Sequence, residues 1–136
     1  MSRRQEIVDI LKARLQTIEG IKSVDEWKMA RVTDSDMPAV VLRDVGSSVA
    51  NETSSSSSHS LQIEIDILVS DKETTMPTLR NFMSEVLRVV GSDGDDNFYE
   101  YRTYNGDEII VEHQDKIYGG VQMKFTVVYD ATTWEM

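Results

Sequence analysis

Residues 61–69 read Leu-Gln-Ile-Glu-Ile-Asp-Ile-Leu-Val and form the clearest strand signal in the chain. Apolar residues at every second position alternate with mostly polar ones, so one face of this strand is buried and the other lies in water. An acidic, wet face is typical of an antiparallel sheet or a sheet edge rather than of a parallel sheet covered on both sides. The stretch therefore predicts a largely antiparallel sheet with one polar face.

Two amphipathic helices are expected, one before and one after this strand. The first covers Arg3–Glu19, where apolar residues recur at helical spacing between a cap at Ser2 and a glycine stop. The second begins at Thr74 or Thr75, has a proline in its first turn and ends at Gly91. Their apolar faces predict that both helices pack on the sheet.

Five further strands complete the expected fold. Asn105-Gly106 lies between two alternating segments and predicts a tight hairpin turn, and a second turn is expected near residues 114–116. At 136 residues the chain fits one domain, residues 1–136. The prediction is an α+β domain with two helices on a mostly antiparallel sheet, in the order α-β-β-β-α-β-β-β. The five further strands are expected at Ile21–Trp27, Pro38–Val45, Phe98–Tyr104, Glu108–His113 and Val121–Tyr129.

Residues 46–58 contain a run of five serines and few residues that could be buried. Such a composition predicts a mobile loop, and a long loop inside a compact domain is often functional or becomes ordered on binding. The sequence therefore makes this loop a candidate protein interface. Its candidate contact residues are Val49, Asn51, Glu52 and Thr53.

The chain carries 24 acidic and 14 basic residues, for a net charge of −10. This balance argues against a surface that wraps nucleic acid or binds an anionic membrane, because both need clustered Lys and Arg. Residues 91–115 hold eight of the acids against Arg102 alone. One interpretation of this segment is a solvated acidic face that keeps the protein soluble.

The chain contains no cysteine, so disulfide scaffolds, thiolate catalysis and cysteine-based zinc sites are excluded. It has no apolar run long enough to span a bilayer, and its first residues lack the apolar segment of a signal peptide. From these features we expect a protein that works, or is assembled, inside a cell.

No pattern of catalytic residues is visible. His59 adjoins the serine run, but a flexible loop offers neither the rigid turn nor the oxyanion hole that a serine nucleophile needs. Asp93-Gly94-Asp95-Asp96-Asn97 resembles the start of a calcium loop but lacks its glycine and glutamate at the required spacing. Weak Ca²⁺ or Mg²⁺ binding by these carboxylates stays open. We expect no catalytic residues, no cofactor and no dedicated metal site.

The aromatic residues near position 100 permit two interpretations. Phe98, Tyr99, Tyr101 and Tyr104 could stack on the bases of a single strand, but neighbouring acids would repel its backbone. Packing of strand aromatics across the sheet is the favoured interpretation.

The chain resembles the tail-terminator or minor tail protein U-like family of long-tailed bacteriophages and prophages. The resemblance covers nearly the whole length and rests on the order of its segments. These are the first helix ending at Glu19-Gly20-Ile21, the strand Met37–Leu42, the polar loop before His59–Ile65, the second helix and the strand Phe125–Thr132.

This resemblance implies a structural protein and not an enzyme. Such proteins form a ring, usually hexameric, on the finished tail tube in the host cytoplasm and remain in the virion tail. The ring contacts the major tail tube protein and the head-completion proteins, and DNA passes through it. We expect Asp93, Asp95 and Asp96 to face that conduit and repel phosphates. The alternatives are a small intracellular α+β module that binds a protein or ligand without catalysis, and a metal-dependent enzyme built on the 93–115 carboxylates.

Overall fold

The computed structural model describes residues 2–27, 34–51, 53–71, 75–113 and 117–136. The predicted fold class is confirmed, because two helices accompany a five-stranded, mostly antiparallel sheet, with one strand fewer than expected. The elements are α1 (Arg3–Leu15), β1 (Ser23–Glu26), a 3-10 helix (Asp34–Asp36), β2 (Ala39–Asn51), β3 (Ser56–Asp71), α2 (Thr75–Gly91), β4 (Tyr101–His113) and β5 (Ile117–Thr132).

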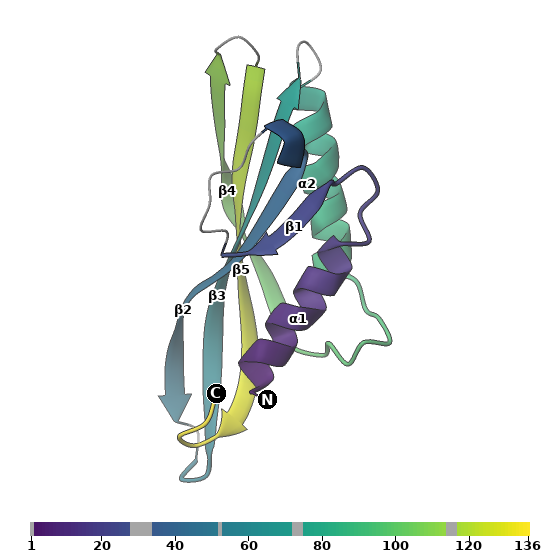
Figure 1. Ribbon diagram of the computed structural model, residues 1–136. Coiled ribbons are helices and arrows are strands. Elements are labelled where there is room, and N and C mark those ends of the chain that lie inside the picture. The colour runs from purple at the N-terminus through teal and green to yellow at the C-terminus, as the bar shows by residue number, and fades with distance from the viewer. Residues whose placement is uncertain (1, 28–33, 52, 72–74, 114–116) are drawn as a thin grey trace.

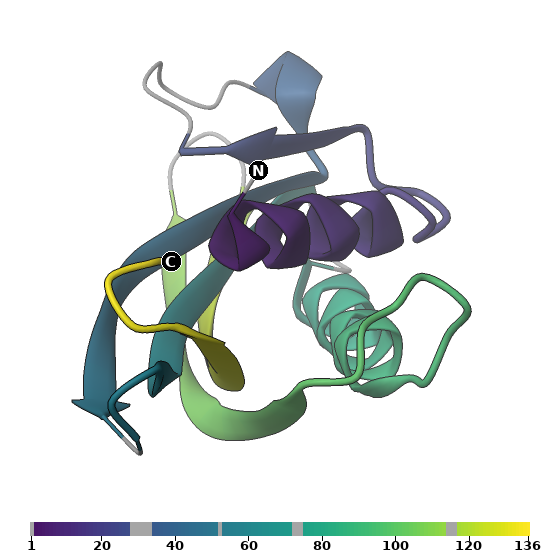
Figure 2. The ribbon, with the colours of Figure 1, turned by 90° about the horizontal axis from the view of Figure 1, so that it is seen from below.

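The strands lie in the order β1-β2-β3-β5-β4, and every neighbouring pair is antiparallel except β1 with β2. Both helices lie on the same face of this sheet (Figure 1). The loop that follows α2 runs beside both helices before it reaches β4 (Figure 2). One face of the sheet therefore meets the helices, and the other is free of them.

The core lies between the helices and the sheet. The five alternating apolar residues of β3, from Leu61 to Val69, are at most 2% exposed, which confirms the strand predicted from their period of two. Burial of each such side chain contributes about 1.5–3 kcal/mol to stability. They pack with Ile7, Leu11 and Leu15 of α1, Leu79, Val86 and Val90 of α2, and Met123, Phe125 and Val127 of β5.

The helix-free face of β3 is mostly polar, as the alternation predicts. Arg43 of β2 donates hydrogen bonds to Glu64 and Asp66 of β3, each at 2.9 Å. Burial raises the pKa of the Asp66 carboxyl, although Arg43 opposes this effect. Ion pairs between neighbouring strands thus replace apolar packing on this face.

α1 starts as predicted but ends earlier. The Ser2 hydroxyl accepts a hydrogen bond from the backbone N–H of Gln5 at 3.1 Å, as a capping residue should. Beyond Leu15 the backbone bonds become i to i+3, and the Thr17 hydroxyl donates to the Arg14 carbonyl at 2.6 Å. These tighter bonds end the helix four residues before the predicted end at Glu19.

The prediction of a loop at residues 46–58 is wrong, because residues 46–51 belong to β2 and residues 56–58 belong to β3. β3 pairs with β2 on one side and with β5 on the other, so Ser57 and Ser58 of the serine run are paired on both sides and Ser56 is paired with β5. Backbone pairing orders this segment without requiring large apolar side chains.

The predicted turn at Asn105-Gly106 is also wrong. β4 continues through these residues and pairs with β5 on both sides of them, with a register shift between Tyr104 and Gly106. Asn105 is therefore the extra residue of a β-bulge, and Gly106 adopts a positive φ of 113° there. Two predicted strands become one, which accounts for the lower strand count.

Two predictions concern residues outside the described ranges, namely a helix cap at Thr74 and the turn near 114–116. Among the described helices, neither combines the length and apolar character needed to cross a bilayer.

Candidate interaction surfaces

β4 forms one lateral edge of the sheet (Figure 1). It pairs with β5, and within the described ranges no strand pairs with its other side. Several of its large apolar or aromatic side chains are exposed to solvent. Their exposed fractions are 71% for Tyr101, 40% for Tyr104, 39% for Ile109, 60% for Ile110 and 38% for Val111. An edge of this kind is a template for pairing with another strand.

The sequence carried a signal for this edge that pattern analysis missed. Ile109, Ile110 and Val111 are three consecutive apolar residues in a strand that should alternate. A strand with one buried face can hide only every second residue, so at least one of the three must be exposed. The run therefore marks either a doubly covered strand or a surface that binds another chain.

The opposite edge of the sheet is also partly open. β1 pairs only with Ala39–Leu42 of β2, and the described residues supply no backbone partner on that side for residues 43–51. Val45 is the extra residue of a bulge, because Asp44 and Gly46 oppose consecutive residues of β3. Val45 is 42% exposed and Val49 is 55% exposed, so this edge also presents apolar side chains.

The predicted contact residues of the serine-rich segment lie at the end of a β-hairpin. Val49 is exposed and faces His59 across the strand pair, and the backbone of Asn51 pairs with Ser57. Thr53 closes the hairpin tip, because its hydroxyl accepts a hydrogen bond from the Ser56 N–H at 3.0 Å. Glu52 lies outside the described residues.

A stack of two rings supports this hairpin. The rings of His59 and Tyr129 lie 4.9 Å apart at an interplanar angle of 17°, and both side chains are buried. Nearer the tip, the Thr133 N–H donates to the Ser55 carbonyl at 3.0 Å, so the end of the chain holds the tip in place. These contacts hold the hairpin as an ordered extension of the sheet.

Asp44 joins the base of the hairpin to α1. Its carboxylate accepts hydrogen bonds from Arg4 of α1 at 2.8 Å and from the Trp27 indole at 2.7 Å. Burial would raise the pKa of Asp44, but the bonds from Trp27 and Arg4 outweigh it and hold that pKa below its ordinary value.

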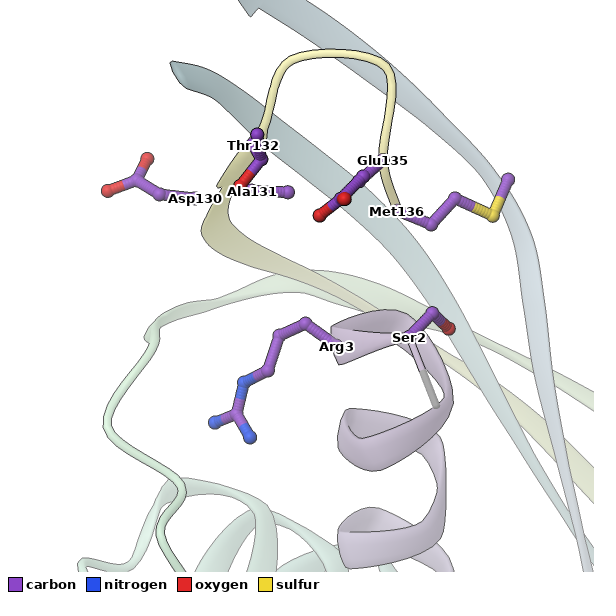
Figure 3. Close-up of a pocket in the computed structure, with 7 residues that line it drawn as sticks. All are labelled: Ser2, Arg3, Asp130, Ala131, Thr132, Glu135 and Met136. Atoms are coloured by element: carbon purple, nitrogen blue, oxygen red, sulfur yellow. The ribbon is translucent and has the colours of Figure 1, made fainter. Parts of the chain in front are cut away.

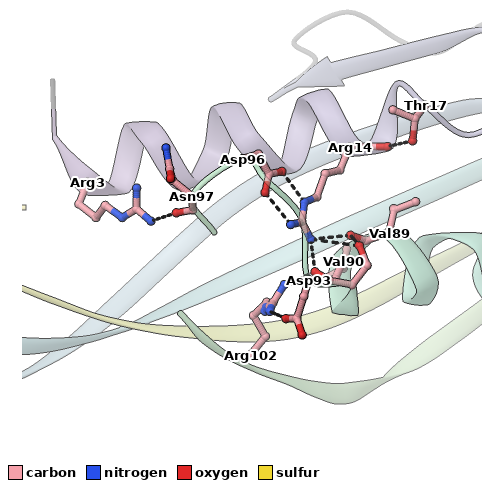
Figure 4. Close-up of polar contacts among 10 residues, drawn as sticks. Arg3, Arg14, Thr17, Val89, Val90, Asp93, Asp96, Asn97 and Arg102 are labelled. Carbon is pink, nitrogen blue, oxygen red and sulfur yellow. Dashed lines mark hydrogen bonds and ion pairs between the residues drawn. The ribbon is translucent and has the colours of Figure 1, made fainter. Parts of the chain in front are cut away.

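The acidic segment after α2 is partly tied to the protein body (Figure 4). Arg14 of α1 is 7% exposed and donates to both carboxylate oxygens of Asp96, at 2.7 and 2.8 Å. The same guanidinium donates to the carbonyls of Val89 at 2.9 Å and Ser92 at 2.7 Å. The hydrogen bonds from Arg14 hold the pKa of Asp96 below its ordinary value. Asp96 therefore has a structural partner.

Asp93, Asp95 and Asp96 all have exposed side chains, but Arg14 binds only Asp96. Arg102 lies 3.3 Å from Asp93 and donates mainly to the Val90 and Ser92 carbonyls, at 2.9 and 3.0 Å. The structure thus separates the three predicted acids into one anchored residue and two that face solvent.

The aromatic residues near position 100 also separate. Phe98 is 1% exposed, and the guanidinium groups of Arg14 and Arg102 lie over its ring, at 5.0 and 4.5 Å from the ring centre. Tyr104 packs on Phe125 of β5 at 5.2 Å between ring centres. Burial and a hydrogen bond to Asp107 raise the pKa of Tyr104 to about 12. Packing across the sheet is thus confirmed for Tyr104. Phe98 is buried but precedes β4, and Tyr99 and Tyr101 are exposed.

A shallow hollow of about 550 Å³ lies where the two chain ends meet (Figure 3). Arg3 lines it, but its guanidinium already donates to Glu100 at 2.6 Å, to Glu6 at 2.9 Å and to the Asn97 carbonyl at 2.7 Å. Since these acceptors satisfy the cation, the hollow lacks the free charge that would select an anionic ligand.

Across the described ranges, no group of three or more His, Asp or Glu side chains is placed so that it could hold a metal ion. No protein-family model matches the chain, and no curated protein sequence matches it.

Proposed function

We propose that this chain is a structural phage or prophage tail protein, which forms a ring that ends tail-tube polymerisation and joins tail to head. The observation that supports it best is the pair of open sheet edges, β4 and residues 43–51 of β2. A ring needs a heterologous interface, in which one surface of a subunit meets a different surface of the next. The two edges are different surfaces of one subunit.

The remaining parts of the proposal follow from the family resemblance. The ring is expected to be hexameric, to contact the major tail tube protein on one side and head-completion proteins on the other, and to let DNA pass. The hairpin tip around Thr53 and the exposed Trp134 lie at one end of the sheet. This end is a suitable surface for one of those partners because an exposed tryptophan is a common centre of protein interfaces.

The proposal is tested with the tail tube protein encoded beside this chain in its genome. Purified tube protein is polymerised with and without the chain, and tube lengths are measured by electron microscopy. We expect shorter tubes that carry a ring at one end. Tubes of unchanged length without end rings, or a gene neighbourhood without tail-tube and tape-measure genes, would contradict the proposal.

The alternative is a small α+β protein-binding module without catalysis. The open apolar edge of β4 favours it, because such an edge can accept an extended peptide from a different protein. This alternative predicts a monomer that leaves tube length unchanged.

A further inference from the structure

The exposed edge of β4 combines features that favour pairing with another strand. Before the bulge at Asn105, Tyr101 and Tyr104 present aromatic rings to solvent, 71% and 40% exposed. Natural edges are usually protected by proline, charged side chains, a bulge or a covering element. β4 contains neither proline nor lysine, and its bulge and its acids lie after Tyr104. Within the described ranges, β5 is the only strand that pairs with it.

Charge indicates which strand can pair there. β4 carries Asp107, Glu108 and Glu112 against Arg102, so a pair of β4 strands from two copies would hold a net charge of −4 and repel. The free part of β2 carries Arg43 and Asp44, which balance each other and are paired within the same subunit. It also presents exposed Val45 and Val49, which lie within one row of Tyr104 and Tyr101 of β4 in the sheet and can cover them in the next copy.

Strand direction gives a second, independent reason. β2, β3, β5 and β4 alternate in direction because each neighbouring pair is antiparallel. With four strands, β4 runs opposite to β2. If copies are related by rotation about an axis along the strands, β4 of one copy therefore meets β2 of the next in antiparallel orientation, and the alternation continues.

We propose that β4 of one copy pairs antiparallel with residues 43–51 of β2 in the next copy, which makes the ring wall one continuous sheet. The inference rests on the ring in the proposed function and names the strands that close it. Asp44 lies in the same row of the sheet as Tyr104, and Ser48 in the same row as Tyr101. Since a rotation about an axis along the strands keeps each row at its level, residues 101–104 meet residues 44–48 of the next copy.

Engineered disulfides test the pairing, since the chain has no cysteine of its own. Cross-strand partners share a face and a level, so Ser48→Cys is combined with Tyr101→Cys or Thr103→Cys. Val49→Cys with Ile109→Cys is the control, because these residues lie in different rows. We expect at least one of the Ser48 double variants to give a ladder of covalent oligomers on oxidation, while the control and the single variants give none. Dimers formed by single β4 variants would instead show β4–β4 pairing and overturn the proposal.

A charge on the edge provides a second test. Tyr101→Lys should weaken ring association at least about tenfold, measured by light scattering across a concentration series. Thermal unfolding should stay unchanged because Tyr101 is already 71% exposed. Tyr99→Lys is the matched control, since Tyr99 is 78% exposed but precedes the strand.

The outcomes separate the two proposals. Rings that resist Tyr101→Lys, with double cysteine variants that give no cross-links, reject the strand pairing and leave the tail-ring function intact. A wild-type chain that forms rings through these edges but leaves tube length unchanged rejects the tail function and retains the pairing. A wild-type chain that stays monomeric, together with double cysteine variants that form no cross-links, overturns the pairing.

Discussion

Arg14 connects α1 to the end of α2 and to the acidic segment through several hydrogen bonds. It is a charged residue on the buried face of α1, where the helical period of apolar residues would predict an apolar side chain. Its guanidinium satisfies carbonyl groups at the end of α2 and the carboxylate of Asp96, and it also covers Phe98. One side chain thus fixes the loop that carries the acidic segment against both helices.

The Arg14–Asp96 contact predicts a pH-dependent stability. The Asp96 pKa is lowered in the folded protein, so the pair stabilises the fold above the unfolded-state pKa of about 3.9, and this contribution is lost as pH falls through the lowered pKa. Asp96→Asn should cost less than about 1 kcal/mol at pH 7, because the carboxylate is 37% exposed and solvent screens it.

The measurement is urea denaturation of wild type and Asp96→Asn between pH 2 and 7, with Asp95→Asn as the matched control from the same loop. The difference between wild type and Asp96→Asn should vanish at the acidic end, whereas Asp95→Asn should follow wild type throughout. A difference that grows toward acidic pH would refute this assignment.

At the scale of elements, β4 shows how a bulge replaces a turn. Asn105-Gly106 has the composition of a hairpin turn, but β5 is long enough to pair with β4 on both sides of it. The extra residue preserves the pairing and restores the alternation, so Tyr104 faces Phe125 while Asp107 faces Met123. Gly106 does adopt the positive φ that Asn-Gly favours, but pairing with β5 places it in a bulge rather than in a turn.

Gly106→Ala tests the bulge. Gly106 has a φ of 113°, which L-residues rarely adopt, and a Cβ there would meet no atom within 4 Å. The substitution should therefore cost about 1–3 kcal/mol through backbone strain alone. Chemical denaturation measures this cost, with Gly46→Ala as the control because Gly46 also has an open position but no positive φ. Equal stabilities of the two variants would contradict the strain argument.

At the scale of the whole molecule, the acidic segment does not form one uniform surface. Asp96 is anchored to Arg14, Asp93 and Asp95 extend into solvent, and further acids lie along β4. The hypothesis of a DNA-repelling face therefore rests on Asp93 and Asp95 only, because reversal of Asp96 would also break the contact that holds the loop.

Reversal of the two acids that Arg14 does not bind, Asp93 and Asp95, tests that hypothesis within the proposed tail ring. Asp93→Lys with Asp95→Lys should leave assembled particles intact but slow DNA exit, because lysine attracts phosphates that carboxylates repel. The rate of DNA release is compared with that of the neutral pair Asp93→Asn and Asp95→Asn, for which we expect an intermediate effect. Unchanged release from the lysine variant would count against a lumen position.

The sequence by itself determined the class of fold, because the spacing of apolar residues and the helix caps act locally. The strand at residues 61–69, the helix that follows Ser2 and the helix end at Gly91 are each confirmed. Only the tertiary structure decided that the serine tract is a strand and that β4 is one strand with an open apolar edge. Backbone pairing is satisfied by a partner distant in the sequence, so composition could not report it. The candidate interface arises from that pairing, because an edge exists only once the order of the strands is known.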